Sequence, residues 1–317
     1  MKIGFLLYPT AGVKVDEDSS FWIMNELLCR GHRVFYFESS AMIGSQRGPR
    51  ARLTPARLDI KKGYLPSAPS KNYEDLSLFD AIFIRKEPPF GLPYLYALQL
   101  LETIKDRVFI LNDPAGIALA NEKLFSLRFA RYAPESLVTE DPLVARAFIR
   151  GLRSHAVVKP LDDKGGRGIF EASSKDKKLM KKLEAVTSSG KLKVILQRFV
   201  SAKKHGDKRL VVLNGKILGA FLRRPPKNDF RANLSVGGTM HRASVSAWDK
   251  KMVSDMHPLL DRYGLYFTGL DVIGKYLTEV NVTSPAGIPE IHQFDRSYPE
   301  RKVADFIEKR CLARKRS

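Results

Sequence analysis

The sequence predicts an α/β protein whose C-terminal part belongs to the α+β class. Short apolar strands alternate with helical segments through the first third of the chain, a pattern typical of a mainly parallel sheet. Farther along, strands follow one another as hairpins with polar turns, which indicates antiparallel sheets. With 317 residues, 44% of them hydrophobic, the chain is long enough for two or three packed units.

The N-terminal unit is expected over residues 1–118. Asp18-Ser19-Ser20 is a predicted N-cap signal for a helix over 21–29, and Gly31 is its predicted C-cap. Ligands bind at the carboxyl ends of parallel strands, so segments 15–20 and 85–90 are candidates for a binding site. The basic, proline-rich stretch 44–71 is predicted to leave the sheet and to be partly β or irregular. The strands are predicted at 3–8, 34–38, 80–85 and 108–112.

Two further units are expected over 119–200 and 201–310, followed by a basic tail at 311–317. The second unit should contain a helix over 118–131 and strands over 155–160 and 194–200. A loop with Gly165, Gly166 and Gly168 follows Lys159 directly. Glycine lets backbone amides approach an anion closely, so this loop suits phosphate, although glycine-rich hairpin loops are also common without a ligand.

Two hairpins are predicted in the third unit. The first spans 208–224, turns at Asn214-Gly215 and places Arg209 and Arg224 at its open end, where paired surface charge is the alternative interpretation. The second spans 268–285.

In the second hairpin, Glu279 and Asn281 share one face of a strand because side chains alternate with a period of two. Asp271 joins them across a three-residue connection at 274–276 or a bulge, whereas a clean two-residue turn would send it to the other face. Such oxygen ligands suit Mg²⁺; a solvated polar face is the alternative.

Charge and cysteine content limit the function classes. The net charge is +20, with basic clusters at 47–62, 175–193 and 309–317. These clusters lack interleaved aromatic residues, so an anionic small-molecule ligand or a general compositional bias is favoured over nucleic-acid binding. No apolar run approaches the ~18 residues that a membrane helix needs. Cys29 and Cys311 have neither metal-site nor disulfide spacing, which predicts a cytoplasmic protein.

Seven segments in this order and spacing resemble the bacterial glutathione synthetases, a family of ATP-grasp ligases. The resemblance extends from residue 2 to about residue 290, and its order and spacing make coincidence implausible. The segments are Asp18-Ser-Ser-Phe21, Arg85-Lys-Glu-Pro-Pro-Phe90, Asn121-Glu-Lys-Leu-Phe125, Val158-Lys-Pro-Leu-Asp162 with Gly165-Gly166, Gly206-Asp-Lys-Arg209, Arg231-Ala-Asn-Leu-Ser-Val-Gly-Gly238, and Gly269-Leu-Asp-Val-Ile-Gly274 through Thr278-Glu-Val-Asn-Val-Thr-Ser-Pro285.

The resemblance implies roles for individual residues of this chain, both within and outside the seven segments. Lys123 and Lys159 would hold the phosphates of ATP, and the loop with Gly165, Gly166 and Gly168 would close over them. Arg209 and Arg224 would face the transferred phosphoryl group. The implied adenine segment is Gln197, Arg198, Phe199 and Val200, with Asp207 at the ribose; the implied metal ligands are Asp271, Glu279 and Asn281; the implied substrate residues are Asp18, Ser19, Ser20, Arg85, Lys86, Arg231, Asn233, Ser284 and Pro285.

The resemblance also implies a reaction. The substrates would be ATP, γ-glutamylcysteine and glycine, with Mg²⁺, or Mn²⁺ in its place, and no membrane partner. A homo-oligomer is implied by family analogy. Segments 164–168 and 226–239 are the predicted lids. Two alternatives stay open: an ATP-grasp ligase for another acid or amine, and a nucleic-acid-binding protein without ligase activity. The chain departs from the family pattern at Glu87, at Arg198 and in its less glycine-rich loop at Asp163-Lys164.

Overall fold

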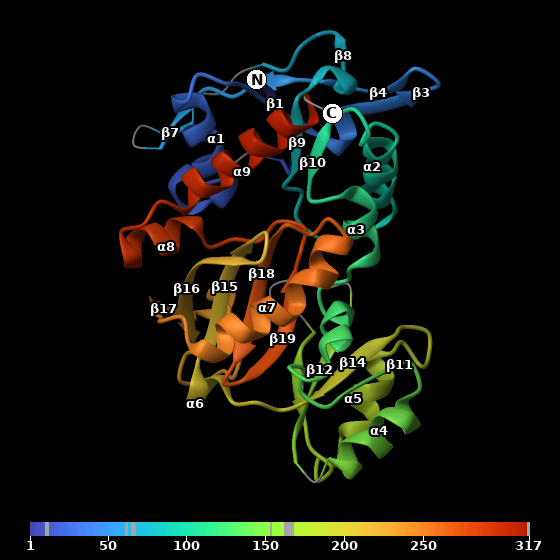
Figure 1. The fold of residues 1–317 in the computed structure, drawn as a ribbon. Helices are drawn as coiled ribbons and strands as arrows, with labels where there is room; N and C mark the ends of the chain where they lie inside the picture. Colours follow the sequence, from blue (N-terminus) through green and yellow to red (C-terminus); the bar gives the residue numbers. More distant parts are fainter. Residues whose placement is uncertain (10–12, 61–62, 65–67, 153, 162–167, 316–317) are drawn as a thin grey trace.

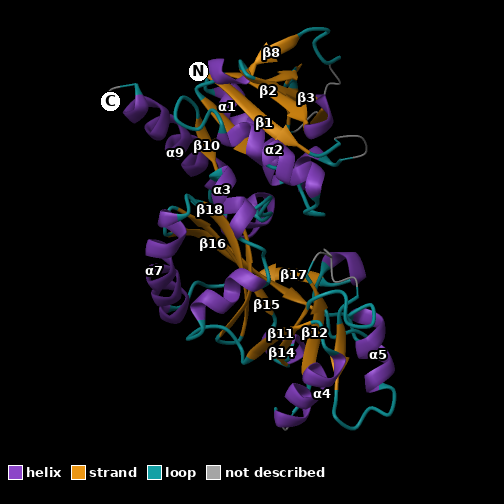
Figure 2. Cartoon of the chain, turned by 90° about the vertical axis from the view of Figure 1, so that its right-hand side faces the viewer, coloured by secondary structure: helices purple, strands orange, loops and turns teal. Residues whose placement is uncertain are grey.

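The computed structural model describes residues 1–9, 13–60, 63–64, 68–152, 154–161 and 168–315. Three parts follow one another along the long axis of the molecule (Figure 1). The N-terminal part contains a parallel sheet, the middle part a large antiparallel sheet, and the far part a small antiparallel sheet. Both chain termini lie at the N-terminal end in two perpendicular views (Figure 2).

The N-terminal sheet has the strand order β10-β9-β1-β2-β5. The first four of these strands run parallel, and β5 is antiparallel to β2, which confirms a mainly parallel sheet. Alternate residues of β1 enter two different cores, so both faces of the sheet are covered. The bounds are β1 Lys2–Leu7, β2 Arg33–Glu38, β5 Thr54–Pro55, β9 Ala81–Ile84 and β10 Phe109–Leu111.

Capping residues position the first helix. Asp18 is the N-cap of α1 (Ser19–Cys29), where its side chain accepts a hydrogen bond of 2.6 Å from the Ser20 amide. Gly31 follows the helix with φ +79°, a conformation that favours glycine. The remaining helical segments of this part are η1 Val15–Glu17, η2 Ser39–Ala41, η3 Leu76–Leu78, α2 Leu92–Glu102 and α3 Pro114–Leu119.

The excursion predicted at 44–71 is largely β in its described residues. Strands β3 (Met42–Ser45), β4 (Gly48–Arg52) and β8 (Tyr73–Asp75) form a three-stranded sheet. A second, two-stranded sheet pairs β6 (Leu58–Asp59) with β7 (Gly63–Tyr64).

The single helix predicted over 118–131 is wrong. Helix α3 ends at Leu119, and a 3-10 helix, η4 (Leu124–Phe129), follows after a turn. The side chain of Asn121 accepts hydrogen bonds from the amides of Lys123 and Leu124 at 3.0 and 3.1 Å. These bonds hold the backbone in a turn that competes with regular helix.

The small sheet is antiparallel, with the strand order β11-β14-β12-β13. Helices α4 (Pro142–Gly151) and α5 (Leu179–Val186) pack on it around their own apolar core (Figure 2). The strand bounds are β11 Ser136–Thr139, β12 Ala156–Pro160, β13 Phe170–Ala172 and β14 Val194–Arg198.

The central sheet has the order β17-β16-β15-β18-β19, all antiparallel. Helix α7 (Ala247–Arg262) covers one face, where Lys208 of β15 bonds Asp249 at 2.6 Å. The predicted turn at Asn214-Gly215 is present, with φ +47° and +71°. The other bounds are α6 Ala202–His205, β15 Asp207–Leu213, β16 Lys216–Arg224, η5 Leu234–Val236, β17 Thr239–Arg242, β18 Phe267–Ile273 and β19 Tyr276–Asn281.

The connection between β18 and β19 places Asp271 on the same face as Glu279, but through a bulge rather than through a three-residue connection. The turn is the two residues Gly274-Lys275, because Ile273 pairs with Tyr276, and the predicted three-residue connection is wrong. The register then shifts between Asp271 and Val272, so a bulge sets Asp271 opposite Glu279. Asp271 therefore shares a face with Glu279.

The C-terminal segment returns to the N-terminal part. Helix α8 (Ile288–Asp295) leads into α9 (Pro299–Arg314), which lies against α1 in Figure 1. Arg30, the C-cap residue of α1, bonds Asp305 and Glu308 of α9 at 2.7 and 2.9 Å. Residues 311–314 are therefore the last turn of a packed helix rather than a free tail.

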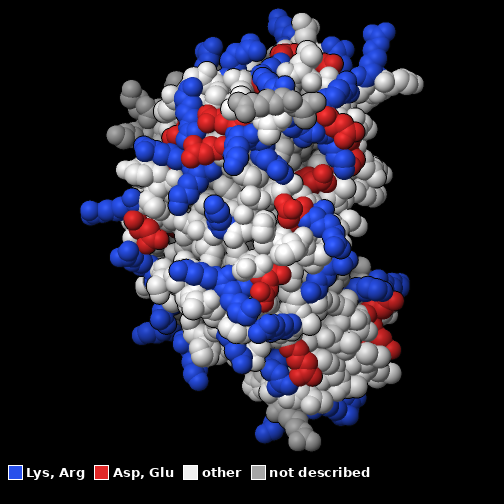
Figure 3. Space-filling model, viewed as in Figure 1, with Lys and Arg blue, Asp and Glu red and all other residues white. Residues whose placement is uncertain are grey.

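Basic side chains are spread over the whole face of the molecule seen in Figure 3. Acidic side chains lie among them, most densely over the N-terminal part. None of the helices in the described part of the chain is long and apolar enough to cross a membrane.

Candidate active site

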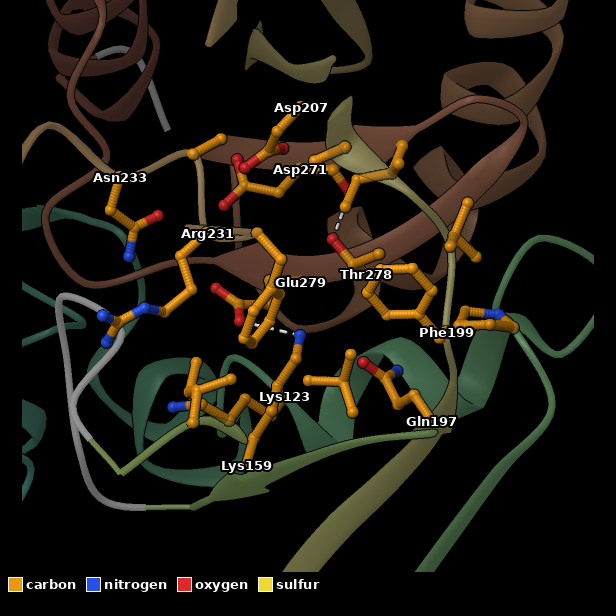
Figure 4. A pocket seen from close by; sticks show the side chains of 18 of the residues that line it. Lys123, Lys159, Gln197, Phe199, Asp207, Arg231, Asn233, Asp271, Thr278 and Glu279 are labelled. Atoms are coloured by element: carbon orange, nitrogen blue, oxygen red, sulfur yellow. Dashed lines mark hydrogen bonds and ion pairs between the residues drawn. The ribbon is translucent and has the colours of Figure 1, made fainter. Parts of the chain in front are cut away.

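A pocket of about 830 Å³, including its open mouth, lies between the small sheet and the central sheet (Figure 4). β12 and β14 supply one wall, and β15, β18 and β19 supply the other. The segment from Phe230 to Asn233 also lines it. The predicted residues among its lining are Lys123, Lys159, Gln197, Arg198, Phe199, Val200, Asp207, Arg231, Asn233, Asp271 and Glu279.

The two lysines predicted for phosphate are buried and paired with carboxylates. Lys123 Nζ lies 2.9 Å from Glu122 Oε1, and Lys159 Nζ lies 3.1 Å from Glu279 Oε1. Lys123 precedes η4, whereas Lys159 comes from β12. Two segments, one before η4 and the other in β12, thus bring both lysines to the same pocket.

An ion-pair network on the central sheet holds Asp271. Arg209 binds this carboxylate through Nε and Nη2 at 2.5 and 3.0 Å, and Arg223 Nη2 lies 2.9 Å from it. Burial favours a raised pKa for Asp271, but the charges of the two arginines outweigh it and lower the pKa to about 2. Arg223 also bonds Asp207 at 2.7 Å, yet burial keeps the pKa of Asp207 raised.

The structure places Arg223, and not the predicted Arg224, beside Arg209. Arg223 pairs with Asp207 in the register of β15 and β16, whereas Arg224 is exposed and pairs with Thr239 of β17. Successive residues of a strand point to opposite faces, so Arg224 is turned away from the pocket. The prediction selected the wrong member of two adjacent arginines.

The residues predicted beside adenine lie on and just after β14. Gln197 is buried, and its side-chain amide donates to Ser136 Oγ at 3.3 Å. The guanidinium of Arg198 bonds Glu135 and the Leu152 carbonyl, both in the part of the chain that forms the small sheet, so it does not point to the pocket as a free charge. Phe199 packs near Phe230, with ring centroids 6.1 Å apart.

Glu122 is a pocket residue that the sequence reasoning missed. Burial raises the pKa of its carboxyl, and the negative charge of Glu279 raises it further. The Glu122 carbonyl also accepts a 2.8 Å hydrogen bond from the amide of Val280 on β19. The sequence feature that could have identified Glu122 as a pocket residue was its position next to Lys123.

Two of the three predicted glycines, Gly165 and Gly166, lie outside the described residues. Gly168 is described; it is exposed, has φ +64° and is followed by Ile169, which lines the pocket.

The metal-ligand prediction can be compared with the donor atoms present. Asn281 Nδ2 lies 3.3 Å from Asp271 Oδ2, so all three predicted ligands lie on one face of β18 and β19. Among the described residues, no group of three His, Cys, Asp or Glu side chains is arranged to hold a metal ion. Both oxygens of Asp271 are bonded to guanidinium groups, so Glu279 and Asn281 are the residues of this face whose oxygen atoms suit a hard cation such as Mg²⁺.

A second cluster joins the N-terminal part to the segment after β19. Arg85 is 1% exposed, with Nε donating to Ser20 Oγ and Nη1 donating to the Pro285 carbonyl, both at 3.0 Å. Ser19 Oγ accepts from the amides of Gly287 and Ile288 at 3.0 and 3.1 Å. Burial lowers the pKa of Arg85.

Asp18 belongs to the same cluster, where Tyr8 Oη donates to it at 2.5 Å. Lys86 lies at its edge, with Nζ 5.5 Å from the Tyr94 ring centroid, and Ser284 is half-buried beside Pro285. Arg231 and Asn233 do not join this cluster; they line the larger pocket, where Arg231 pairs with Asp229 at 2.7 Å.

The fold is that of the ATP-grasp ligases. D-cycloserine synthetase DcsG matches with a TM-score of 0.68 at 15% identity, covering 97% of this chain and 99% of that chain. D-alanyl-alanine synthetase A from Vibrio cholerae matches with a TM-score of 0.62 at 14% identity, covering 98% of each chain. At these identities the likeness shows the fold alone.

The sequence specifies the family. Residues 1–118 match the N-terminal domain of prokaryotic glutathione synthetase, and residues 122–296 match its ATP-grasp domain. Glutathione synthetase of Thermosynechococcus vestitus is 37% identical over 93% of this chain and 96% of that protein. The protein from Coxiella burnetii with the same description is 34% identical over 93% and 92%. The chain belongs to the prokaryotic glutathione synthetase family and is an ATP-dependent ligase that forms glutathione.

Proposed function

We propose that the pocket between the two antiparallel sheets binds ATP with Mg²⁺, and that the adjoining cluster around Arg85 places γ-glutamylcysteine and glycine. The observation that carries this proposal is the meeting of Lys123 and Lys159 with the acidic face of β18 and β19 in one pocket. Cationic and anionic groups are needed together where a nucleotide phosphate and a divalent cation bind.

The nucleotide is proposed to lie along β14, with adenine near Gln197 and Phe199 and the ribose near Asp207. Arg198 contributes only its backbone in this arrangement, because its guanidinium is bonded to Glu135 and Leu152. Lys123 and Lys159 neutralise the phosphates; of the glycine-rich loop, Gly168 belongs to the described residues and precedes Ile169 of the pocket lining.

The proposed metal ligands are Glu279 and Asn281, with Asp271 beside them. Mg²⁺, or Mn²⁺ in its place, would supply charge neutralisation of the transferring phosphoryl group when bound. Asp271 has both oxygens bonded to guanidinium groups, so it orients Arg209 and Arg223 as well as adding negative charge near the site.

The chemistry follows from these positions. The glycine-accepting carboxylate of γ-glutamylcysteine attacks the γ-phosphorus of ATP, giving an acyl phosphate and ADP. Arg209 and Arg223 stabilise the negative charge that develops on the transferred oxygens. The glycine amine then attacks the acyl carbon and phosphate leaves. Segment 226–239, which includes pocket residues Arg231 and Asn233, is the proposed lid that excludes water from the acyl phosphate.

The substrate residues are assigned by position. Asp18, Ser19, Ser20 and Arg85 lie at the carboxyl end of the parallel sheet, together with Pro285. Such an end is where ligands bind in open α/β sheets. Lys86 and Ser284 border this cluster and are proposed to contact the peptide.

The test is a substrate screen with purified protein. ATP, Mg²⁺, γ-glutamylcysteine and glycine together should release phosphate and yield glutathione, and omission of any one should stop both. Phosphate release with a different acid or amine, and none with this pair, would refute the assignment of substrates.

The cellular setting is proposed on the same basis. Cys29 and Cys311 are both unpaired, as expected in the reducing cytoplasm. A homo-oligomer is expected from the family resemblance, and light scattering of the purified protein checks it.

A further inference from the structure

Glycine enters the reaction as an ammonium ion at neutral pH, and its nitrogen can attack only after losing a proton. The residues assigned above bind phosphate, metal and peptide, and none of them takes this proton. A carboxylate near the arginines that is not already committed to a donor would meet the requirement.

Glu290 is placed for this task by the start of α8. The first amides of that segment, those of Gly287 and Ile288, are held by Ser19 Oγ at 3.0 and 3.1 Å. The helix also packs tightly on β16, where a Cβ at Gly219 would lie 2.4 Å from Ile291. Glu290 is the third residue of this fixed helix, between the Ser19 cluster and the central sheet.

The surroundings of Glu290 belong to the active site. The charged groups with the largest influence on its carboxylate are Arg209 of β15, Asp18 at the start of α1 and Arg223 of β16. The two arginines are those proposed to face the transferred phosphoryl group. Glu290 therefore feels the charges of both arginines and of Asp18, and it follows the start of α8 that Ser19 of the N-terminal part holds.

Other carboxylates of this region already accept bonds from donors. Asp18 accepts from Tyr8 Oη at 2.5 Å and from the Ser20 amide at 2.6 Å. Asp271 is held by two arginines, and Glu279 is held by Lys159. Oε2 of Glu290 is buried and has no hydrogen-bond partner among the described residues; Oδ1 of Asp207 shares this property, but the other oxygen of Asp207 is bonded to Arg223. A buried carboxylate oxygen without a donor gains free energy from an incoming ammonium group.

Burial also raises the pKa of the Glu290 carboxyl. A carboxylate with a raised pKa is a stronger base and accepts a proton from an ammonium group more readily than a solvated one. A glutamate in the first turn of a helix is favourable for the helix itself, so the ordinary interpretation of Glu290 is structural. The two roles predict different responses to a change of amine.

We propose that Glu290 is a further catalytic residue that binds the ammonium group of glycine and takes its proton; this assignment rests on the proposed function. One proton moves from the ammonium group to the Glu290 carboxylate. The nitrogen lone pair forms the C–N bond, and the C–O bond to phosphate breaks with its electron pair on phosphate. The second nitrogen proton goes to the departing phosphate, and Glu290 later returns its proton to solvent.

The experiment compares Glu290→Gln with the unsubstituted enzyme in the presence of ATP, Mg²⁺ and γ-glutamylcysteine. Glycine is one acceptor, and hydroxylamine, which is mostly unprotonated at pH 7, is the other. Glutamine keeps the size and hydrogen-bonding capacity of the side chain but cannot accept the proton. The expected result at pH 7 is a loss of ~10²-fold in kcat/KM for glycine. Hydroxamate formation should stay close to that of the unsubstituted enzyme.

A pH profile gives the second readout. Raising the pH increases the fraction of glycine that is already a free amine, so the deficit of Glu290→Gln with glycine should shrink steadily as the pH rises. Glu300→Gln is the matched control: Glu300 is also a buried glutamate in the first turn of a helix, with an unpartnered Oε2 and a pKa raised by burial. It lies on α9, outside the site, and its substitution should leave both acceptors unaffected.

Three outcomes would overturn the assignment. Equal losses with glycine and hydroxylamine would show a structural role, or a contact with the ammonium group of γ-glutamylcysteine. An unchanged rate with glycine would show no role, and a deficit independent of pH would exclude proton transfer. Failure of the proposed function is distinguishable, because the unsubstituted enzyme would then form neither glutathione nor hydroxamate from γ-glutamylcysteine.

Discussion

Arg223 and Arg224 are adjacent arginines for which the structure predicts opposite outcomes. Arg223 is 12% exposed in its side chain and bonds Asp207 and Asp271 at 2.7 and 2.9 Å. Arg224 is exposed at the end of β16, on the other face of the strand. Replacing each in turn by glutamine removes the same charge from two adjacent positions on opposite faces of the strand, one buried and ion-paired and the other exposed.

The loss of stability expected for Arg223→Gln depends on the two carboxylates, Asp207 and Asp271, that lose this partner. Breaking a buried ion pair by removing one partner costs ~3–5 kcal/mol. Asp271 keeps two bonds from Arg209, so the lower end, about 3 kcal/mol, is expected. The pKa of Asp207 is already raised and rises further without Arg223, so the variant gains protonation in the folded state. The stability deficit should therefore shrink as the pH falls below that raised pKa.

Two assays test this expectation. Urea unfolding gives the stability difference, and phosphate release with ATP, γ-glutamylcysteine and glycine gives turnover, for which Arg223→Gln should lose ~10²–10³-fold. Arg224→Gln should change stability by no more than about 0.5 kcal/mol and leave turnover nearly unchanged. Equal damage from both substitutions, or a mild effect of Arg223→Gln, would refute the assignment of Arg223 to the site.

Three further substitutions test other parts of the structure. Glu279→Gln should lower kcat by ~10²-fold at saturating Mg²⁺, and near-normal turnover in a Mg²⁺ titration would show that the cation lies elsewhere. Asn112, which follows β10, makes three buried hydrogen bonds to the backbone of Phe267 on β18 and of Val282 just after β19. Asn112→Ala should therefore cost about 3 kcal/mol in urea unfolding, and a loss well below this would show that these bonds do not hold the N-terminal part to the central sheet. Gly116→Ala would place a Cβ 1.9 Å from the Tyr263 carbonyl oxygen, so a loss of ~1–3 kcal/mol is expected, and unchanged thermal unfolding would show that the contact relaxes freely.

The sequence was sufficient to predict β12 and β14 of the small sheet, the two hairpins of the central sheet and the turn at Asn214-Gly215, because alternation and turn chemistry are local properties. The edge strands β11, β13 and β17 were not predicted. Which of Arg223 and Arg224 lies on the same face as Arg209 depends instead on the pairing register of β15 and β16. A hairpin with a clean two-residue turn would set Arg209 opposite Ala220 and put Arg224 on its face. The register shift between Val211 and Val212 instead sets Arg209 opposite Phe221, which selects Arg223.

The second bulge acts in the same way on the metal face. A regular β18–β19 hairpin around Gly274-Lys275 would set Asp271 opposite Thr278, on the face away from Glu279. The shift after Asp271 restores the pairing with Glu279. Bulges depend on how a strand packs against its neighbours. The sequence therefore showed that Asp271 could share a face with Glu279 only through an odd-length connection or a bulge, but it did not show which of the two the chain uses.

Long-range packing accounts for other differences. The 3-10 helix after Lys123 depends on hydrogen bonds of the Asn121 side chain, and α9 is held by contacts of Arg30 with residues some 275 positions away. From sequence alone, a charge-rich C-terminus is predicted to be a solvated tail, because the distant residues that contact it are not known. Here its apolar side, including Cys311, is buried against the N-terminal part.

The pairs within the pocket explain why phosphate and metal are expected to bind together. Lys159 is proposed to hold a phosphate, and its partner at 3.1 Å, Glu279, is proposed to hold the cation. A phosphate arriving alone would draw Lys159 away and leave Glu279 buried beside another anion and beside Glu122, whose pKa its charge already raises. A cation arriving alone would separate Glu279 from Lys159 and leave that ammonium group buried without its partner. Each ligand therefore compensates the charge that the other uncovers, which favours their joint binding over either alone.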